Sequence, residues 1–371
     1  MASFLVLEDG TVFRGRPYGG HGLAVGEVVF TTSMTGYQEV VTDPSYAGQL
    51  VTFTQPMIGN YGVEPAASEA DRPAAGAVIV REGRNAAPGE RRGFADWLAE
   101  HGVVGLQGVD TRAVTRRLRS GGSLRGAVST GSAGVEEVLE IVRAAPAMAG
   151  QALAASVSLA TSRDLPALAP ERAHLAVLDY GIKSSIVRLA REAGARVTQL
   201  PWDTPAAAVL GLDADGVLLG NGPGDPAALD ACIGEVRQLV GQTPIFGICL
   251  GHQLLGLALG LDTFKLRFGH RGANHPVLEL ASGRVLVTAQ NHGFAVRGPE
   301  RGREFGSDFG PGRVTHVSLY DGTVEGLELD GLPVSSLQFH PEASPGPHDA
   351  RGALAGFVDQ VASADAEQAV A

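Results

Sequence analysis

A cysteine flanked by glycines marks the place in this chain where covalent chemistry is most expected. Gly247, Cys249 and Gly251 form the pattern Gly-x-Cys-x-Gly between an apolar strand-like run and an apolar helix-like run. This pattern is typical of a nucleophile elbow, in which small residues let the chain turn sharply and present one side chain in a cleft. The start of the following helix favours a thiolate through its dipole and its unpaired N–H groups. An inert buried thiol is the alternative, but the two glycines make Cys249 the predicted nucleophile.

A thiol nucleophile needs a base, and the base needs a group that orients it. The chain has ten histidines, of which His340 leaves a buried strand-like run and is followed directly by Pro341 and Glu342. In an extended chain, residues two apart point to the same side. Glu342 can then hold one imidazole nitrogen while the other faces the thiol. The sequence therefore predicts a catalytic triad of Cys249, His340 and Glu342.

A second glycine-rich turn covers residues 220–226, with the sequence Gly-Asn-Gly-Pro-Gly-Asp-Pro. Its spacing does not match a dinucleotide-binding fingerprint, and Asp225 would repel a pyrophosphate. Asp225 and Pro226 instead suit the N-cap and the first position of a helix. The backbone N–H groups of this turn are expected to serve an oxyanion beside Cys249, while a plain connecting turn is the alternative.

Three other histidines, His270, His275 and His292, raise the question of a metal site. No HExxH, HxH or paired-cysteine spacing accompanies them, so no metal is predicted. His252, in the first turn after the elbow, is expected to cap or pack the helix. Cys232, within a helix-like stretch, is expected to be a core thiol.

Composition limits the class of protein. The chain has 371 residues, a formal net charge of −11 and only two cysteines. The acidic balance argues against nucleic acid or an anionic membrane as the main partner. Two cysteines are too few for a disulfide framework or a structural zinc site. With no apparent signal peptide and no apolar run long enough to cross a bilayer, the protein is expected to be cytoplasmic.

The elements that must position these residues fall into two α/β domains with a connector between them. Residues 1–145 mix short strands with helices, which predicts a β-rich α/β domain; Asp110 is expected to cap one of its helices. Residues 146–172 are rich in Ala, Ser, Thr and Pro, as connectors are. Residues 173–371 alternate strands with helices, including one from Pro226 to about Val240, which predicts a three-layer α/β/α domain with a mostly parallel sheet. Cys249 then follows a strand at its carboxyl end, where such sheets bind ligands.

Together these motifs resemble the class I (triad) glutamine amidotransferases, which place a Cys-His-Glu triad on a parallel α/β sheet. The flanking sequence narrows the resemblance to the small subunits of carbamoyl-phosphate synthases. The segments that carry it extend over nearly the whole chain, at residues 7–13, 32–39, 42–46, 109–112, 221–226, 246–254, 268–276, 290–295 and 340–349.

The resemblance implies that the chain hydrolyses L-glutamine to glutamate and ammonia. In that family a large synthetase subunit receives the ammonia and uses bicarbonate and ATP to make carbamoyl phosphate for pyrimidine and arginine synthesis. The implied assembly is a heterodimer with such a large subunit. ATP and magnesium are expected in that partner, and no cofactor is expected in this chain.

The resemblance also assigns roles to individual residues. It makes Cys249 the group that attacks the side-chain amide, His340 the group that moves the proton, and Glu342 the group that orients His340. The backbone N–H groups of Leu250 and Gly222 match the oxyanion donors of the family, and Lys183 matches a position near the site whose role is not settled. The positions that contact glutamine are matched by Ser45, Gly222, Gly224, Leu250, Gln253, Asn291, Gly293 and Phe294.

Other functions stay open at this level. The chain can be the glutaminase of a different synthase, such as the anthranilate or guanylate enzymes, although its N-terminal half argues for the first assignment. It can also be a catalytically silent scaffold that regulates a synthetase, against which the intact set Cys249, His340 and Glu342 argues. A thiol peptidase finds no support in the remaining motifs.

Overall fold

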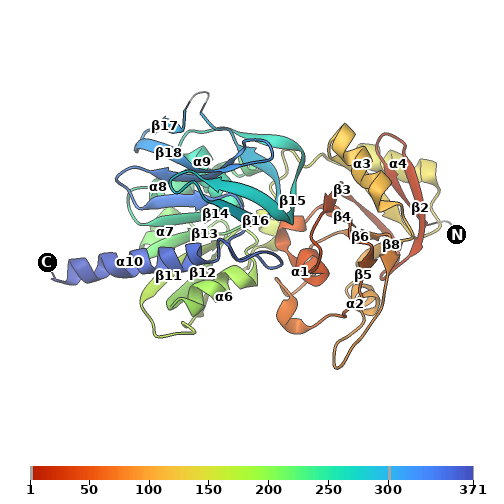
Figure 1. The fold of residues 1–371 in the computed structure, drawn as a ribbon, viewed down its shortest axis with the longest axis horizontal. Helices are drawn as coiled ribbons and strands as arrows, with labels where there is room; N and C mark the ends of the chain where they lie inside the picture. The colour runs from red at the N-terminus through yellow and green to blue at the C-terminus, as the bar shows by residue number, and fades with distance from the viewer. Residues whose placement is uncertain (1–2, 300–301, 371) are drawn as a thin grey trace. The chain divides into compact units, whose positions relative to one another are not determined.

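The chain folds into two compact units in the computed structural model, which describes residues 3–299 and 302–370 (Figure 1). The first unit comprises the residues up to Gln151 together with Leu266–Gly272, and the second comprises Ala152–Lys265 and the residues from Ala273 onward. Within the described ranges, no helix combines the length and apolar character needed to cross a membrane.

A closed β-barrel forms the centre of the first unit, with strand order β1-β2-β8-β6-β4-β3-β9. The sequence indicated a β-rich domain but not this closure. The barrel strands are β1 Ser3–Leu7, β2 Val12–Pro17, β3 Leu23–Thr31, β4 Gln49–Phe53, β6 Ala77–Val80, β8 Val104–Gln107 and β9 Leu124–Ser129. A small separate sheet pairs β5 Met57–Ile58 with β7 Glu82–Gly83, and the helices of this unit are α1 Tyr37–Thr42, α2 Phe94–Glu100, α3 Thr111–Gly121 and α4 Val135–Ala144.

Alternate side chains of the barrel strands pack into different layers. Leu5 and Leu7 belong to an apolar cluster that includes residues of α3, whereas Phe4 and Val6 pack against α4. Successive side chains of a strand point to opposite faces, so this alternation follows directly from the apolar run at residues 4–7. The same run therefore supplies two layers of the core.

A mixed sheet forms the centre of the second unit, in the order β10-β12-β11-β13-β14-β20-β19-β18-β15-β16, with β17 paired to β18. The central strands β12, β11, β13, β14 and β20 run parallel, and antiparallel pairs extend the sheet on both sides. The strands are β10 Arg163–Leu165, β11 Ala173–Asp179, β12 Ala195–Pro201, β13 Gly216–Leu219, β14 Ile245–Ile248, β15 Thr263–Glu279, β16 Val285–Val296, β17 Glu304–Ser307, β18 Gly310–Ser318, β19 Val324–Leu329 and β20 Val334–Leu337.

Helices cover both faces of this sheet (Figure 1). Leu175 and Val177 of β11 pack with α6 and α10, whereas the intervening Ala176 and Leu178 pack with α7, α8 and α9. A strand buried on both faces reads as a continuous apolar run, as β11 does. The predicted three-layer arrangement is confirmed. The helices of this unit are α5 Ala154–Val157, α6 Ser184–Glu192, α7 Ala206–Leu210, α8 Asp230–Leu239, α9 Leu250–Ala258 and α10 Gly352–Val370.

Two predicted helix starts have different outcomes. Asp110 caps α3 as predicted, because its Oδ1 accepts a hydrogen bond of 3.0 Å from Ala113 N. Asp225 also caps a helical turn, but that turn ends after three residues, and Leu229 leaves helical geometry at φ −105° and ψ 46° before α8 begins. The prediction of one continuous helix from Pro226 is therefore wrong.

The stretch expected to be a connector contains regular structure. Within residues 146–172, α5 and β10 form, and β10 pairs antiparallel with β12. Arg163 strengthens this pairing because its Nε donates to Gln199 Oε1 at 2.9 Å. A short, largely exposed edge strand lacks the apolar pattern from which strands are predicted. The domain boundaries drawn at 145 and 173 remain a prediction.

Candidate active site

Cys249 stands at a sharp turn between β14 and α9. Its backbone adopts φ 55° and ψ −101°, a region that residues other than glycine rarely occupy. The flanking glycines allow the close approach of chain that this turn needs: a Cβ at Gly251 would lie 2.3 Å from the Leu219 carbonyl oxygen, and one at Gly247 would lie 2.8 Å from the Gly251 backbone. Gly251 N donates to Gly220 O at 3.0 Å, which ties the start of α9 to the end of β13. This geometry is that of the predicted elbow.

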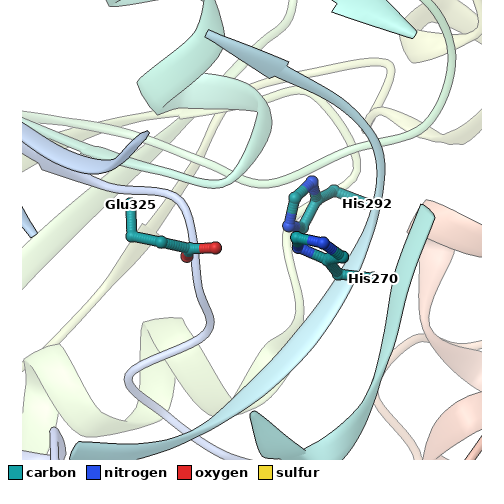
Figure 2. Close-up of side chains that lie close together, drawn as sticks. All are labelled: His270, His292 and Glu325. Carbon is teal, nitrogen blue, oxygen red and sulfur yellow. The ribbon is translucent and has the colours of Figure 1, made fainter. Parts of the chain in front are cut away.

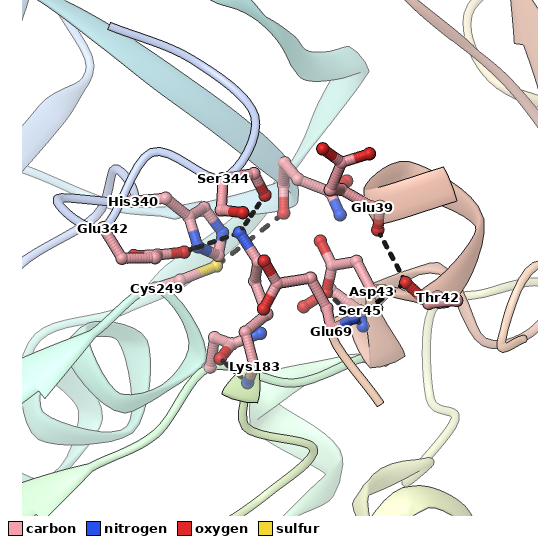
Figure 3. A network of polar contacts seen from close by, with 12 residues as sticks. Glu39, Thr42, Asp43, Ser45, Glu69, Lys183, Cys249, His340, Glu342 and Ser344 are labelled. Atoms are coloured by element: carbon pink, nitrogen blue, oxygen red, sulfur yellow. Dashed lines mark hydrogen bonds and ion pairs between the residues drawn. The ribbon is translucent and has the colours of Figure 1, made fainter. Parts of the chain in front are cut away.

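His340 and Glu342 lie together in a buried pair, with His340 Nδ1 2.7 Å from Glu342 Oε1 (Figure 3). The predicted extended conformation is wrong, because residues 341 and 342 form a turn in which Ala343 N donates to His340 O at 3.2 Å. His340 N donates in addition to Ala289 O at 2.9 Å. The two side chains meet as expected, but a turn rather than strand alternation brings them together.

Lys183 completes this pair from the loop between β11 and α6. Its Nζ donates to Glu342 Oε1 at 2.8 Å and to Ser344 O at 2.6 Å, and only 4% of its side chain is exposed (Figure 3). Its backbone N donates to the Asn221 side chain at 3.0 Å, which connects it to the second glycine-rich turn. The sequence motifs alone did not predict the contact between Lys183 and Glu342. The available signal is rarity, since Lys183 is one of two lysines in the chain.

The charges of this group set its proton affinities. Burial alone would lower the pKa of His340, but Glu342 and Cys249 outweigh it and raise the pKa to about 10. Burial alone would raise the pKa of Glu342, but Lys183 and His340 lower it to about 2. An ionised Glu342 only accepts hydrogen bonds, so His340 Nδ1 carries a hydrogen. The other ring nitrogen, Nε2, has no hydrogen-bond partner among the described residues.

The sulfur of Cys249 lies 3.7 Å from the backbone oxygen of Asn291, toward which the thiol donates. Asn291 belongs to β16, the strand that also carries Gly293 and Phe294. The structure therefore brings the predicted nucleophile to the strand that holds three of the residues matched to glutamine binding. Only 2% of Cys249 is exposed, which agrees with a site closed to bulk water.

The glycine-rich turn at residues 220–226 lies against the start of α9. A Cβ at Gly222 would lie 2.2 Å from the Tyr180 carbonyl oxygen and 2.8 Å from Leu250 Cδ2, so only glycine fits there. Gly224 has φ 96°, which glycine adopts without strain. Leu250 is the first residue of α9, where backbone N–H groups have no partner within the helix. Gly222 and Leu250 are thus close to each other, and their role as oxyanion donors stays a prediction.

Gln253 and Ser45 are the remaining predicted glutamine contacts. Gln253 Nε2 donates to Phe294 O at 2.8 Å and to Gln338 Oε1 at 3.0 Å, which fixes its side chain next to β16. Ser45 belongs to the first unit, in a turn where its backbone N donates to Asp43 Oδ1 at 2.9 Å, and it is buried there. The part of Ser45 in glutamine binding remains a prediction from the resemblance.

The structure also places the other histidines and the second cysteine that the sequence analysis named. His252 is fully buried in α9, with its Nδ1 2.8 Å from Ser336 Oγ, and burial lowers its pKa to about 3. This confirms a packing role. Cys232 is a core thiol as predicted, 3% exposed and 3.5 Å from Trp202 O. His292 lies on β16 and Glu325 on β19 (Figure 2), whereas His270 belongs to the Leu266–Gly272 segment of the first unit.

Comparison with known proteins gives two family matches that together cover most of the chain. The model of the carbamoyl-phosphate synthase small chain, CPSase domain, matches residues 5–128, and that of the class-I glutamine amidotransferases matches residues 176–359. A carbamoyl phosphate synthase small chain from Thermosynechococcus vestitus is 46% identical over 375 residues, which is 97% of this chain and 96% of the relative. A protein of the same description from Xanthomonas campestris pv. campestris is 47% identical over 376 residues, which is 98% of both chains. Another from Akkermansia muciniphila is 44% identical over 384 residues, which is 100% of both chains.

Proposed function

Because the chain belongs to the family of carbamoyl-phosphate synthase small chains and is a glutamine-hydrolysing enzyme, we propose that Cys249, His340 and Glu342 are its catalytic residues. The observation that carries this proposal is the buried pair of His340 Nδ1 and Glu342 Oε1 at 2.7 Å, with a thiol on a strained elbow in the same unit. The pair leaves Nε2 of His340 as the nitrogen that exchanges protons with the sulfur.

The proposed reaction has two halves that share one imidazole. Cys249 attacks the carboxamide carbon of glutamine as a thiolate, with its proton held by His340, and the N–H groups of Leu250 and Gly222 stabilise the oxyanion that forms. The carbon–nitrogen bond then breaks, His340 gives a proton to the leaving ammonia, and a glutamyl thioester remains. Neutral His340 next takes a proton from water, which attacks the thioester and releases glutamate, leaving Cys249 as a thiolate and His340 protonated as at the start.

Lys183 is proposed to keep this pair in its working charge state. A raised pKa keeps His340 protonated at neutral pH, ready to donate to ammonia. That state needs an ionised Glu342, whose pKa Lys183 and His340 lower against the effect of burial. In this proposal Lys183 does not contact the substrate. It is a positioning residue that acts through Glu342.

We propose that the ammonia passes to a large synthetase subunit, which makes carbamoyl phosphate, and that the two subunits work in the cytoplasm. The support for the partner is the family itself, whose members are described as small chains. The support for the compartment is the pair of unpaired cysteines, Cys232 and Cys249, as is usual where thiols stay reduced.

The decisive experiment separates the glutamine and ammonia routes. Cys249→Ser should abolish glutamine hydrolysis, while synthesis of carbamoyl phosphate from added ammonia by the assembled enzyme should continue. The matched control is Cys232→Ser, which changes the other thiol and should leave both routes active. Loss of both routes in Cys249→Ser, or of neither, would contradict the assignment.

A smaller effect tests the residue that the resemblance adds from the first unit. Ser45→Ala should raise the KM for glutamine severalfold, on the order of one lost hydrogen bond. Steady-state glutamine hydrolysis measures it. An unchanged KM would remove Ser45 from the glutamine site.

A further inference from the structure

Buried polar side chains line one face of β16, the strand matched to glutamine binding. Thr288, Gln290 and His292 are two residues apart and so share this face, and Glu325 of β19 meets them. Glu325 is 0% exposed, and a ring nitrogen of His292 lies within 4.8 Å of its carboxylate (Figure 2). Because burying a charge is costly unless it is paired, the charges of this carboxylate and this imidazole depend on each other.

Gln290 lies between the two groups, and its amide has a defined orientation. The Nε2 atom donates to Glu325 Oε2 at 2.8 Å and to Thr288 Oγ1 at 3.2 Å. This orientation suits an ionised Glu325, because an ionised carboxylate can only accept hydrogen bonds. The amide oxygen of Gln290 then faces the other way, 3.0 Å from His292 Nε2.

His292 meets an acceptor at each ring nitrogen. Its Nε2 faces the Gln290 amide oxygen, and its Nδ1 lies 2.6 Å from the backbone oxygen of Phe294. With the amide in this orientation, neither oxygen has a hydrogen to donate, so both ring nitrogens carry one. An imidazole protonated at both nitrogens is a cation.

We propose that Glu325 and His292 form a buried ion pair bridged by the Gln290 amide, and that this pair positions the glutamine-binding strand. The Phe294 oxygen accepts from His292 Nδ1 and also from Gln253 Nε2 at 2.8 Å. A charge-assisted bond from His292 is stronger than a neutral one and fixes the peptide of Phe294 more tightly. The positioning role rests on the proposed function, because it assumes that Asn291, Gly293 and Phe294 contact glutamine.

One other arrangement of the same atoms is possible, and it defines the test. With the proton on Glu325, the Gln290 amide would turn over, accept from the Glu325 hydroxyl and donate to His292 Nε2. His292 would then be neutral, with a hydrogen only at Nδ1. The two arrangements hold the same number of protons and differ in whether one of them lies on Glu325 or on His292, so they give the imidazole nitrogens different magnetic environments.

Nitrogen NMR of the full chain labelled with ¹⁵N-histidine distinguishes these states at neutral pH. The signals of His292 are identified by their absence in His292→Asn. We expect both ring nitrogens of His292 to have the similar shifts of an imidazolium, and Glu325→Gln to convert them to the separated shifts of a neutral ring. Glu328→Gln makes the same change at a partly exposed position of the same strand and should leave the signals as they are.

Glutamine kinetics tests the positioning role. Glu325→Gln should raise the KM for glutamine about five- to tenfold, the difference between a charge-assisted and a neutral hydrogen bond, and should change kcat less than about twofold. Glu328→Gln should match the unmodified protein in both constants.

Each result decides one part of the proposal. A neutral His292 in the unmodified protein would overturn the ion pair, and this measurement holds even if Glu325→Gln does not fold. An imidazolium together with an unchanged KM in a folded Glu325→Gln would overturn the positioning role. Absence of glutamine hydrolysis by the unmodified protein with its large subunit would instead refute the proposed function, and would leave the NMR result standing.

Discussion

His340 and His252 lie in the same unit and are both almost completely buried, at 3% and 0% exposure, yet their surroundings differ. His340 has the carboxylate of Glu342 at 2.7 Å from its Nδ1, whereas the Nδ1 of His252 lies 2.8 Å from the hydroxyl of Ser336. The pKa of His340 rises to about 10, and that of His252 falls to about 3. At neutral pH the first is a cation and the second is neutral.

The difference shows that burial alone does not decide the charge of a histidine. Loss of water lowers the pKa of both rings, so the sign of the shift depends on whether an anion lies within bonding distance. For His340 that anion is Glu342, which stays ionised because Lys183 is also bonded to it. The proton chemistry of the site is therefore built from three side chains that lie far apart in the sequence.

The largest expected effect comes from removing each histidine in turn. His340→Asn should lower the rate of glutamine hydrolysis by a factor on the order of a thousand, since it removes the general acid and base. His252→Asn should leave that rate within about threefold and lower the free energy of unfolding by about 1–3 kcal/mol, because it disturbs a packed core. Steady-state kinetics and urea unfolding measure the two quantities. Similar losses of activity in both variants would mean that the charge difference has no catalytic meaning.

A smaller effect is expected when the cation beside Glu342 is removed. Lys183→Met keeps the apolar stem but deletes the charge, so the pKa of Glu342 should rise and its hold on protonated His340 should weaken. We expect Lys183→Met to lower kcat about tenfold, the factor that corresponds to a loss of one pKa unit in the interaction between Glu342 and protonated His340. The control Lys183→Arg keeps the charge and should retain more activity than Lys183→Met. If the two variants lose equal activity, the charge of Lys183 is not what matters.

The smallest effects are expected in the pH dependence of stability, where the two histidines should act on opposite limbs. His252 has a folded pKa below its unfolded value of about 6.5, so the unfolded state takes up its proton first and stability is lost as the pH falls from about 6.5 towards 3. His340 has a folded pKa above its unfolded value, so its contribution is complete below about pH 6.5 and is lost as the pH rises towards 10.

Unfolding by urea across this pH range measures both limbs. The difference in free energy of unfolding between the unmodified protein and His252→Asn should shrink on the acid side. The difference between the unmodified protein and His340→Asn should shrink on the alkaline side. A difference that stays constant with pH for either variant would show that the histidine in question titrates alike in the folded and unfolded states.

The sequence predicts the parts of the site that depend on local geometry. The elbow at Cys249 follows from two glycines, because the chain can approach itself so closely only where no Cβ is present. The nearness of His340 and Glu342 is also local, since one turn joins them. The alternation of strands and helices, which is also a local pattern, indicates the three-layer unit.

The remaining features depend on contacts between distant segments. Lys183 reaches Glu342 only because Asn221 and Asp179 fix its loop, through hydrogen bonds to Lys183 N and to the N atoms of Gly181 and Ile182. Closure of the barrel depends on the parallel pairing of β4, β6 and β8. Parallel strands are not joined by short turns, so turn residues in the sequence do not predict this pairing. The ion pair inferred for Glu325 and His292 likewise joins two strands. Such pairings leave no local pattern in the chain.

The segment Leu266–Gly272 has a consequence for the way this protein is made. It belongs to the first unit although the chain on either side of it belongs to the second. Phe268 stacks on Phe30 at 5.9 Å between ring centroids, and the buried Arg271 lies 4.0 Å from the buried carboxylate of Glu27. During translation, more than a hundred residues of the second unit are therefore synthesised between the barrel strands and Arg271, the cation that lies near Glu27. The first unit can therefore be completed only once Gly272 has been translated, although most of its residues precede Ala152 in the chain.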